Sequence, residues 1–192
     1  DLLTLSRLEG SPLPDFTELV DLRALMVQCE AEARALSRML HPSDDRPQRL
    51  TFAQLPGLAL VGAPGEVRSA ISNVVNNAVR YTPTGGAIDV RWHILPGGGA
   101  RLDVTDTGTG IPPEHLSRLG ERFYRVDRSR SRESGGTGLG LAITKHVVQR
   151  HGGELQISSA LGQGSCFSLL FPAQRVRLPI DAAAAEQEPA RS

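Results

Sequence analysis

The sequence predicts an α+β fold, a two-layer α/β sandwich in which helices cover one face of a mixed, mostly antiparallel sheet. Apolar residues recur at helical spacing in three long segments, 18–40, 65–80 and 138–151. Alternating segments typical of strands come in two consecutive pairs, 87–95 with 100–105 and 154–159 with 165–171. Glycine-containing turns join each pair, so the strands pair antiparallel, and their apolar face needs a covering layer of helices.

The chain opens with a leucine-rich segment, 1–9, which is typical of a helix end, and Gly10 and the prolines after it terminate this helix. A helix this short offers no partner for its own leucine stripe, and the sequence begins without Met. We therefore expect a piece of a longer protein. We divide the chain into a helix end and linker over 1–14, the main domain over 15–172, and a disordered Ala-, Glu- and Pro-rich tail over 173–192.

Short elements fill the intervals between the long segments. We expect strands near 49–53 and 58–61 and a short helix near 113–119. Residues 121–134 concentrate arginines around two aromatic residues, and no clear period runs through the second half of this segment. A cationic lid, mobile until it closes over a polyphosphate, fits this composition, and a nucleic-acid patch is the alternative.

Composition excludes several classes of protein. The 21 Lys and Arg residues balance the 21 Asp and Glu residues, so no overall basic excess points to nucleic acid as a partner. Cys29 and Cys166 are far apart in the chain and give neither a metal-binding spacing nor a disulfide framework. The apolar runs are too short for a membrane span.

A polar stripe follows the apolar face of the 65–80 segment. Asn73, Asn77 and Arg80 are spaced by four and three residues, which places them on one side of a helix. Asparagine is unfavourable inside helices, so this stripe suggests a function. An asparagine carbonyl suits Mg²⁺ and an arginine suits phosphate, whereas a solvated helix face is the structural alternative.

Asp106 stands where a strand ends, and the glycines of DTGTG (106–110) follow it. Gly108 and Gly110 allow the backbone to approach a flat ligand, and the carboxylate can accept a hydrogen bond from an exocyclic amine such as that of adenine. The alternative is an aspartate that stabilises its own turn. An aspartic protease also uses Asp-Thr-Gly, but it needs two such carboxylates and a nearly all-β fold, so the helical pattern disfavours it.

The segment GGTGLGLAITK (135–145) leads directly into the 138–151 helix. Its glycine spacing matches neither a dinucleotide-binding loop nor a phosphate loop that ends in Gly-Lys-Ser/Thr. A glycine-led helix start presents free N–H groups that suit an anion. The alternative is a structural loop that precedes a buried helix.

Taken together, these segments resemble the ATP-binding domain of sensor histidine kinases, the Bergerat or GHKL fold. NVVNNAVRYTP (73–83) is similar to the N box and DTGTG (106–110) to the first glycine box. ERFYRVD (121–127) is similar to the F box and GGTGLGLAITK (135–145) to the second glycine box. Segments 68–79 and 118–146 further resemble the phosphate-regulon sensor kinases, which implies phosphate-starvation signalling.

The resemblance implies a site for ATP and Mg²⁺. Asn77 would bind the metal, Asp106 would contact adenine, and Asn73 and Arg125 would take part in catalysis. The implied nucleotide contacts are Asn77, Arg80, Tyr81, Asp106, Gly108, Gly110, Ile111, Tyr124, Arg125, Gly136, Thr137, Gly138, Leu139, Gly140 and Leu141.

The resemblance also indicates which reaction to expect, phosphoryl transfer or ATP hydrolysis. Gyrase- and chaperone-type relatives carry a water-activating Glu four residues before the metal-binding Asn, and here that position is Asn73, which cannot be a general base. None of the five histidines, His41, His93, His115, His146 and His151, precedes an acidic residue as the acceptor of the family does. We therefore expect transfer of the γ-phosphate to a histidine of an upstream dimerisation domain.

The implied partners are this dimerisation and phosphotransfer domain and a cognate response regulator, with no nucleic acid. The implied parent is a membrane-anchored homodimer, with this chain as its cytoplasmic domain at the inner membrane. Two alternatives remain, a stand-alone serine kinase of the anti-sigma type and a non-catalytic ATP-binding regulatory module.

Overall fold

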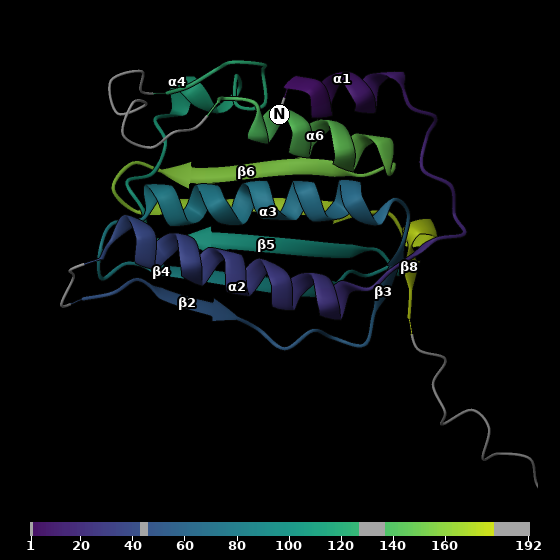
Figure 1. Cartoon of the computed structure of the whole chain (residues 1–192), viewed down its shortest axis with the longest axis horizontal. Helices are drawn as coiled ribbons and strands as arrows, with labels where there is room; N and C mark the ends of the chain where they lie inside the picture. The colour runs from purple at the N-terminus through teal and green to yellow at the C-terminus, as the bar shows by residue number, and fades with distance from the viewer. Residues whose placement is uncertain (1, 43–45, 127–136, 179–192) are drawn as a thin grey trace, which may run out of the picture.

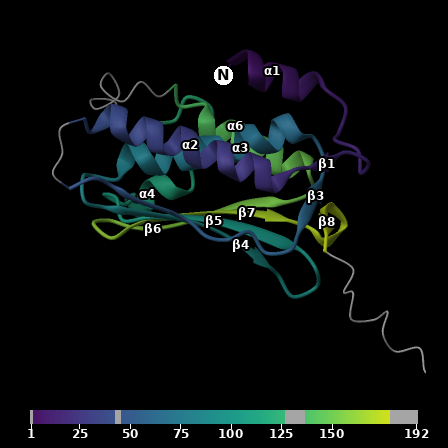
Figure 2. The same ribbon diagram turned by 60° about the horizontal axis from the view of Figure 1, so that its bottom comes forward.

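The computed structural model describes residues 2–42, 46–126 and 137–178 (Figure 1). The predicted two-layer sandwich is confirmed: the long helices lie together on one face of a five-stranded sheet, as Figure 2 shows from the side. Residues 127–136, which include the second part of the predicted lid and Gly136 of the second glycine box, lie outside the described residues.

The main sheet is mixed and mostly antiparallel, in the order β2-β4-β5-β7-β6. Its strands are β2 (Arg49–Phe52), β4 (Ala87–Ile94), β5 (Ala100–Asp106), β6 (Glu154–Ala160) and β7 (Gly164–Phe171). Only the pair β2 and β4 is parallel among these neighbours, and the two predicted hairpins are present as β4–β5 and β6–β7. The strands therefore follow the alternation in the sequence closely.

Helix α3 (Pro64–Tyr81) lies at the centre of the helical layer, between α2 (Leu22–Leu40) and α6 (Gly140–Arg150). Its buried side chains are all apolar: Val67, Ala70, Ile71, Val74, Val75, Ala78 and Val79. Helix α1 (Leu2–Gly10) packs on α6, and the short α4 (Pro113–Leu116) lies near β6. None of the helices in the described ranges has the length and apolar character needed to cross a bilayer.

The sequence-based helix 18–40 starts too early. Leu19 and Val20 form β1, which pairs antiparallel with β3 (Ala59–Val61), and α2 begins only after Asp21. The Asp21 side chain accepts a hydrogen bond from the Ala24 N–H at 2.9 Å, so this residue is the N-cap that sets the start of the helix. Apolar periodicity alone did not separate the short strand from the helix that follows.

The predicted disordered tail also begins too early. Ala173–Arg175 form a 3₁₀ turn, and β8 (Val176–Arg177) pairs with β3, which completes a small sheet in the order β1-β3-β8. Buried Val176 packs into the core, and this apolar contact outweighs the polar composition around it. The ordered domain therefore includes residues 173–178, and the tail from residue 179 onward lies outside the described residues.

His151, just after α6, is a buried histidine that the structure holds neutral. Its Nδ1–H donates to the Val147 carbonyl at 2.8 Å, and its Nε2 accepts the Ala63 N–H at 3.2 Å. Burial is the main cause that lowers the pKa of His151, and the nearby Arg150 and Arg175 guanidinium groups act in the same direction. The Val147 hydrogen bond and Glu66 oppose this shift without reversing it.

This burial predicts an acid-sensitive fold. The unfolded chain takes up a proton on residue 151 near the ordinary histidine pKa of about 6.5, whereas the folded chain does so only at lower pH. The free energy of unfolding should therefore fall as the pH drops below about 6.5, because the unfolded state then binds more protons. Urea unfolding at pH 7.5 and 5.5 would measure this, and His151→Gln should be less stable at pH 7.5 but show a flatter pH dependence. An equal pH dependence in this variant would assign the effect to other groups.

Candidate nucleotide-binding site

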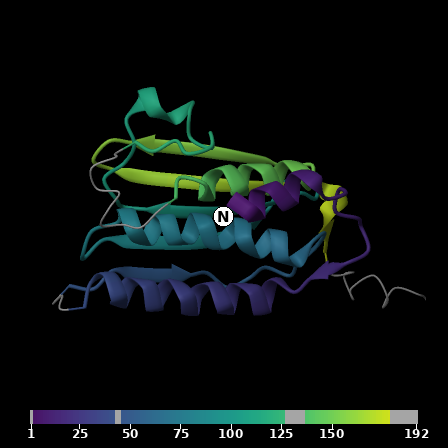
Figure 3. The ribbon, with the colours of Figure 1, turned by 45° about the horizontal axis from the view of Figure 1, so that its top comes forward.

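The predicted site residues that the structure describes come together at one end of the sandwich, where α3 and β5 end and α6 begins (left in Figure 1). The second half of α3 supplies the polar stripe, the turn after β5 supplies the first glycine box, and the start of α6 supplies the second. Figure 3 shows the same end from above, with α4 beside it. Three segments that are separate in sequence therefore form one surface.

Asp106 is the last residue of β5, and only 5% of it is exposed. Its Oδ1 accepts the Gly108 N–H at 2.8 Å. Burial raises the pKa of the Asp106 carboxyl, while hydrogen bonds from the backbone N–H groups of Gly108 and Ser165 act in the opposite direction. A fixed, largely buried carboxyl group at the end of a strand is suited to accept a hydrogen bond from a ligand amine.

The glycines of the first glycine box are required by close backbone packing. A Cβ atom on Gly108 would lie 2.5 Å from the Tyr81 carbonyl oxygen, and one on Gly110 would lie 2.1 Å from the Ala160 carbonyl oxygen. The turn is further fixed where the Ile111 N–H donates to Ser159 Oγ at 2.8 Å. The turn therefore joins the end of α3 to the β6–β7 hairpin, which explains these glycines before any ligand is considered.

Asn73 connects the N box to the second glycine box. Its Nδ2 donates to the Gly140 carbonyl at 3.2 Å, and a Cβ atom on Gly140 would lie 3.4 Å from Asn73 Oδ1. The Thr144 hydroxyl, one turn into α6, lies 3.1 Å from the Ala70 carbonyl oxygen of α3. Asn77 is half-buried one turn beyond Asn73 on the same side of α3, so it is placed at the nucleotide end of this helix pair.

The F box packs against the start of α6. Gly138 has φ of +73°, and a Cβ atom there would lie 3.1 Å from Arg125 Cγ and 3.2 Å from the Phe123 backbone. The Tyr124 hydroxyl lies 2.5 Å from His115 Nδ1. Leu139 is buried in the core, so Gly138 and Leu139 hold the described part of the F box beside the helix start.

Three supporting residues escaped the sequence analysis. Gln48 is buried, and its Nε2 donates to the Val79 carbonyl at 2.9 Å and to the Thr82 carbonyl at 2.5 Å, at the carboxyl end of α3. His115 holds Tyr124, and Ser159 holds the first glycine box. None of them belongs to one of the four motifs, and periodicity gives no signal for the contacts that these side chains make.

An apolar surface depression at the other end of the domain is a poor candidate for this site. It lies beside the β1-β3-β8 sheet and is lined mainly by apolar side chains, including Phe16, Leu19, Leu58, Val61 and Leu178. A nucleotide needs convergent polar groups for its base and phosphates, and these groups gather instead around Asp106.

A strand-end carboxyl, a glycine turn against an amide-bearing helix and a glycine-led second helix define an ATP-binding domain of the Bergerat type. Residues 62–175 match the family described as histidine kinase-, DNA gyrase B- and HSP90-like ATPase, and the chain belongs to this family. The predicted resemblance and the predicted ATP-binding activity are thereby confirmed.

Curated relatives narrow the class to sensor kinases. The chain is 48% identical over 175 residues to the phosphate regulon sensor protein PhoR of Pseudomonas aeruginosa, an alignment that covers 91% of the chain and 38% of the relative. It is 39% identical to the sensor-like histidine kinase SenX3 of Mycolicibacterium smegmatis, over 90% of the chain and 43% of the relative. The chain thus spans about two fifths of the length of these relatives.

Solved structures give the same class. The mycobacterial sensor histidine kinase MprB superposes with a TM-score of 0.65 at 30% identity, covering 81% of this chain and 96% of that one. Full-length ShkA in complex with AMPPNP superposes with a TM-score of 0.73 at 27% identity, covering 97% of this chain and 37% of that one. The domain is therefore of the same type as the ATP-binding catalytic domains of two-component sensor histidine kinases.

The buried carboxyl group predicts the effect of a single substitution. Asp106→Asn should weaken ATP and ADP binding about 10- to 100-fold, because a hydrogen bond to a charged group contributes about 1.5–3 kcal/mol. Isothermal titration calorimetry measures this directly. Asp103→Asn is a matched control, since Asp103 lies on the same strand but points to the opposite face, where Ser168 and His93 contact it. Unchanged affinity in Asp106→Asn would remove this residue from the site.

Proposed function

We propose that this domain binds Mg-ATP and transfers the γ-phosphate to a histidine of a dimerisation and phosphotransfer domain. The observation that carries the proposal is the state of Asn73, whose amide Nδ2 already donates to the Gly140 carbonyl. An amide cannot take a proton from water, so the position that activates water in hydrolytic relatives holds no base here. Transfer to a protein nucleophile instead requires mainly positioning and charge neutralisation.

The residues of the site fit each part of the nucleotide. Asp106 would accept the exocyclic amine of adenine, beside the Gly108 and Gly110 turn. The N–H groups at the start of α6, Thr137 through Leu141, would face the phosphates at the positive end of the helix dipole. Arg80, Tyr81, Tyr124 and Arg125 would line the phosphates or the base.

Asn77 would bind Mg²⁺ through its side-chain oxygen. Mg²⁺ prefers oxygen ligands, keeps several waters and binds proteins through few side chains plus substrate phosphates, which suits one amide on a helix. The ion would neutralise charge on the phosphates, and Arg125 would add to this during transfer.

We further propose that residues 1–14 are the end of the dimerisation domain and its linker, and that the parent is a membrane-anchored homodimer that signals to a response regulator. The domain itself would then lie on the cytoplasmic side. The 48% identity to a phosphate regulon sensor protein supports phosphate starvation as the signal. The sensor-kinase names of the other relatives support the remaining assignments.

The metal assignment predicts a selective loss. Asn77→Ala should abolish most of the gain in ATP affinity that Mg²⁺ provides, while binding in the presence of EDTA stays nearly unchanged. Asn76→Ala, which alters the adjacent position on the same helix, should keep the Mg²⁺ effect. Titrations with and without Mg²⁺ that weaken by equal factors in Asn77→Ala would contradict the assignment.

The lack of an acceptor-type histidine in this sequence predicts which reactions the chain performs alone and which require an added acceptor domain. Incubated alone with labelled ATP, the chain should neither label itself nor hydrolyse ATP appreciably. A separate dimerisation domain with its acceptor histidine should become labelled when it is added, because the bound γ-phosphate is already oriented. Acid-labile label on this chain would mean that one of its own histidines is the acceptor, and rapid hydrolysis would favour a gyrase-like ATPase.

A further inference from the structure

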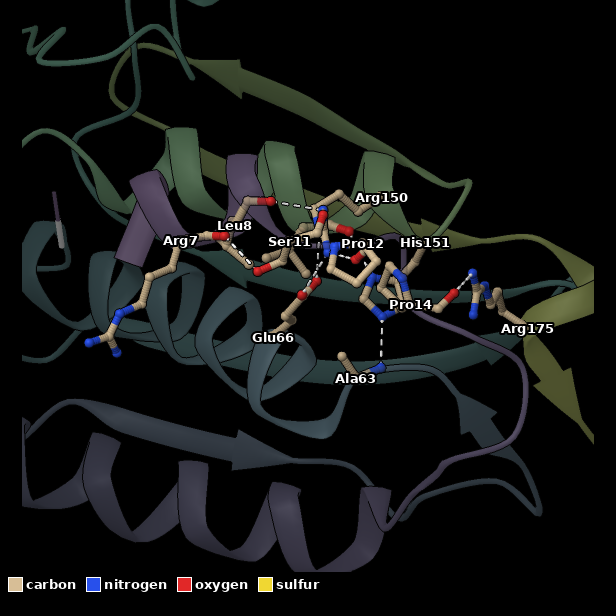
Figure 4. Close-up of polar contacts among 11 residues, drawn as sticks. Arg7, Leu8, Ser11, Pro12, Pro14, Ala63, Glu66, Arg150, His151 and Arg175 are labelled. Carbon is tan, nitrogen blue, oxygen red and sulfur yellow. Dashed lines mark hydrogen bonds and ion pairs between the residues drawn. The ribbon is translucent and has the colours of Figure 1, made fainter. Parts of the chain in front are cut away.

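A second polar cluster lies at the end of the molecule opposite the nucleotide site, and Figure 4 shows it in detail. Its centre is Arg150, the last residue of α6, whose side chain is only 7% exposed. Arg150 Nε and Nη2 each lie 3.1 Å from a Glu66 carboxylate oxygen on α3. This buried, two-point ion pair holds the guanidinium in a fixed orientation.

The rest of the Arg150 guanidinium binds the main chain of the N-terminal segment. Nη1 donates to the carbonyls of Leu8 at 2.8 Å and Ser11 at 3.0 Å, and Nη2 donates to the carbonyl of Pro12 at 2.5 Å. Arginine has five N–H groups, so these three bonds and the two to Glu66 use all of them. The Leu8 carbonyl belongs to the last turn of α1, where a cation also complements the helix dipole.

Arg175 repeats this arrangement a little further along the segment, at residues 14 and 15. Its Nη2 donates to the Pro14 carbonyl at 2.7 Å, and its Nη1 donates to the Asp15 carbonyl. Its guanidinium carbon lies 3.8 Å from the centre of the Phe16 ring, and the residue is only 4% exposed. Two arginines from the folded domain therefore bind residues 8–15 through main-chain oxygens, and these hydrogen bonds do not depend on which side chains the segment carries.

This contact fixes α1 against α6. Leu5 and Leu8 are buried in the core of the domain, and the Glu9 carboxylate pairs with Arg122 of the F box. Figures 1 and 3 agree that α1 lies alongside α6 and starts near the first turn of α6. Any chain that precedes α1 would therefore enter beside α6, whose first turn belongs to the second glycine box.

We propose that Arg150 and Arg175 are positioning residues for phosphoryl transfer, which clamp residues 8–15 so that α1 and the ATP-binding domain move as one body. The inference rests on the proposed function, because it assigns the clamp the task of presenting the upstream acceptor domain to ATP in a fixed orientation. The segment 8–15, despite its prolines and its place between two domains, is then an anchored strap.

Arg150→Gln tests the clamp in two ways. In the 192-residue chain, hydrogen exchange of the α1 amides should accelerate about tenfold or more, because the last turn loses its cap and its anchor. In a protein with the dimerisation domain joined upstream of Asp1, the kcat for labelling its own acceptor should fall about tenfold through lost orientation. The KM for ATP and labelling of a separate acceptor domain should stay unchanged.

Two further variants keep the test specific. Arg68→Gln is the matched control, since Arg68 also pairs with a glutamate, Glu32 at 2.7 Å, but is about half exposed and pairs with α2 instead of the strap. It should change neither exchange nor transfer. Arg150→Lys keeps the charge but not the planar fork, so it should behave like Arg150→Gln.

The outcomes separate the clamp from the proposed function. Wild-type behaviour of Arg150→Lys, or unchanged exchange in α1 of Arg150→Gln, would overturn the clamp. Equal losses of labelling in the joined and the separate acceptor, with a lowered melting temperature, would show a role in stability alone and overturn the positioning role. If the unmodified protein labels no acceptor in either format, the proposed function fails, while the exchange measurement still decides whether the clamp exists.

Discussion

The burial of helix α3 is the constraint on which the rest of the structure depends. Its apolar side faces the sheet and both neighbouring helices, and the side chains of Val67, Ala70 and Val74 are fully inaccessible. A helix packed so tightly cannot rotate or shift along its axis without opening cavities in the core. The positions of Asn73, Asn77 and Tyr81 at the nucleotide end are therefore set mainly by apolar contacts of the opposite side of the helix. The packing of the core therefore fixes the geometry of the site.

Helix α6 connects two functional regions, the glycine-led start at the nucleotide end and Arg150 at the clamp. Its eleven residues correspond to about 16 Å, which spans the distance between the glycine-led start and Arg150 at its end. Polar bonds to α3 fix both ends, Asn73 to Gly140 at the start and Arg150 to Glu66 at the end. Because α6 is rigid and held at both ends, it fixes the position of the strap relative to the nucleotide end. Movement of α1 relative to the nucleotide would require breaking buried polar contacts, which is costly.

The sequence predicted the layers, the strands and the site segments because these depend on local patterns. Apolar periodicity located α3 and α6 to within two residues, and motif order located the residues around Asp106. The errors fell where a single contact overrides composition: the Asp21 cap that shortens α2, and the pairing of Val176 with Leu60 that orders residues after 172. The sequence could not predict the clamp, because the hydrogen-bond acceptors in residues 8–15 are main-chain carbonyls, which every residue carries. Arg150 and Arg175 look like any surface arginine until the fold buries them.

The glycine boxes show why sequence motifs can locate a site without explaining it. Gly108 and Gly110 are required by the carbonyl oxygens of Tyr81 and Ala160, whatever ligand binds nearby. Close packing of backbone on backbone turns the strand end sharply, and that turn leaves the Asp106 carboxyl buried and fixed. The requirement for a tight fold and the requirement for an open approach to a flat base are therefore met by the same residues. The Asn73 amide completes the contact between the two helices. Under the proposed function, the same amide stands where hydrolytic relatives carry a general base, which favours phosphoryl transfer over hydrolysis.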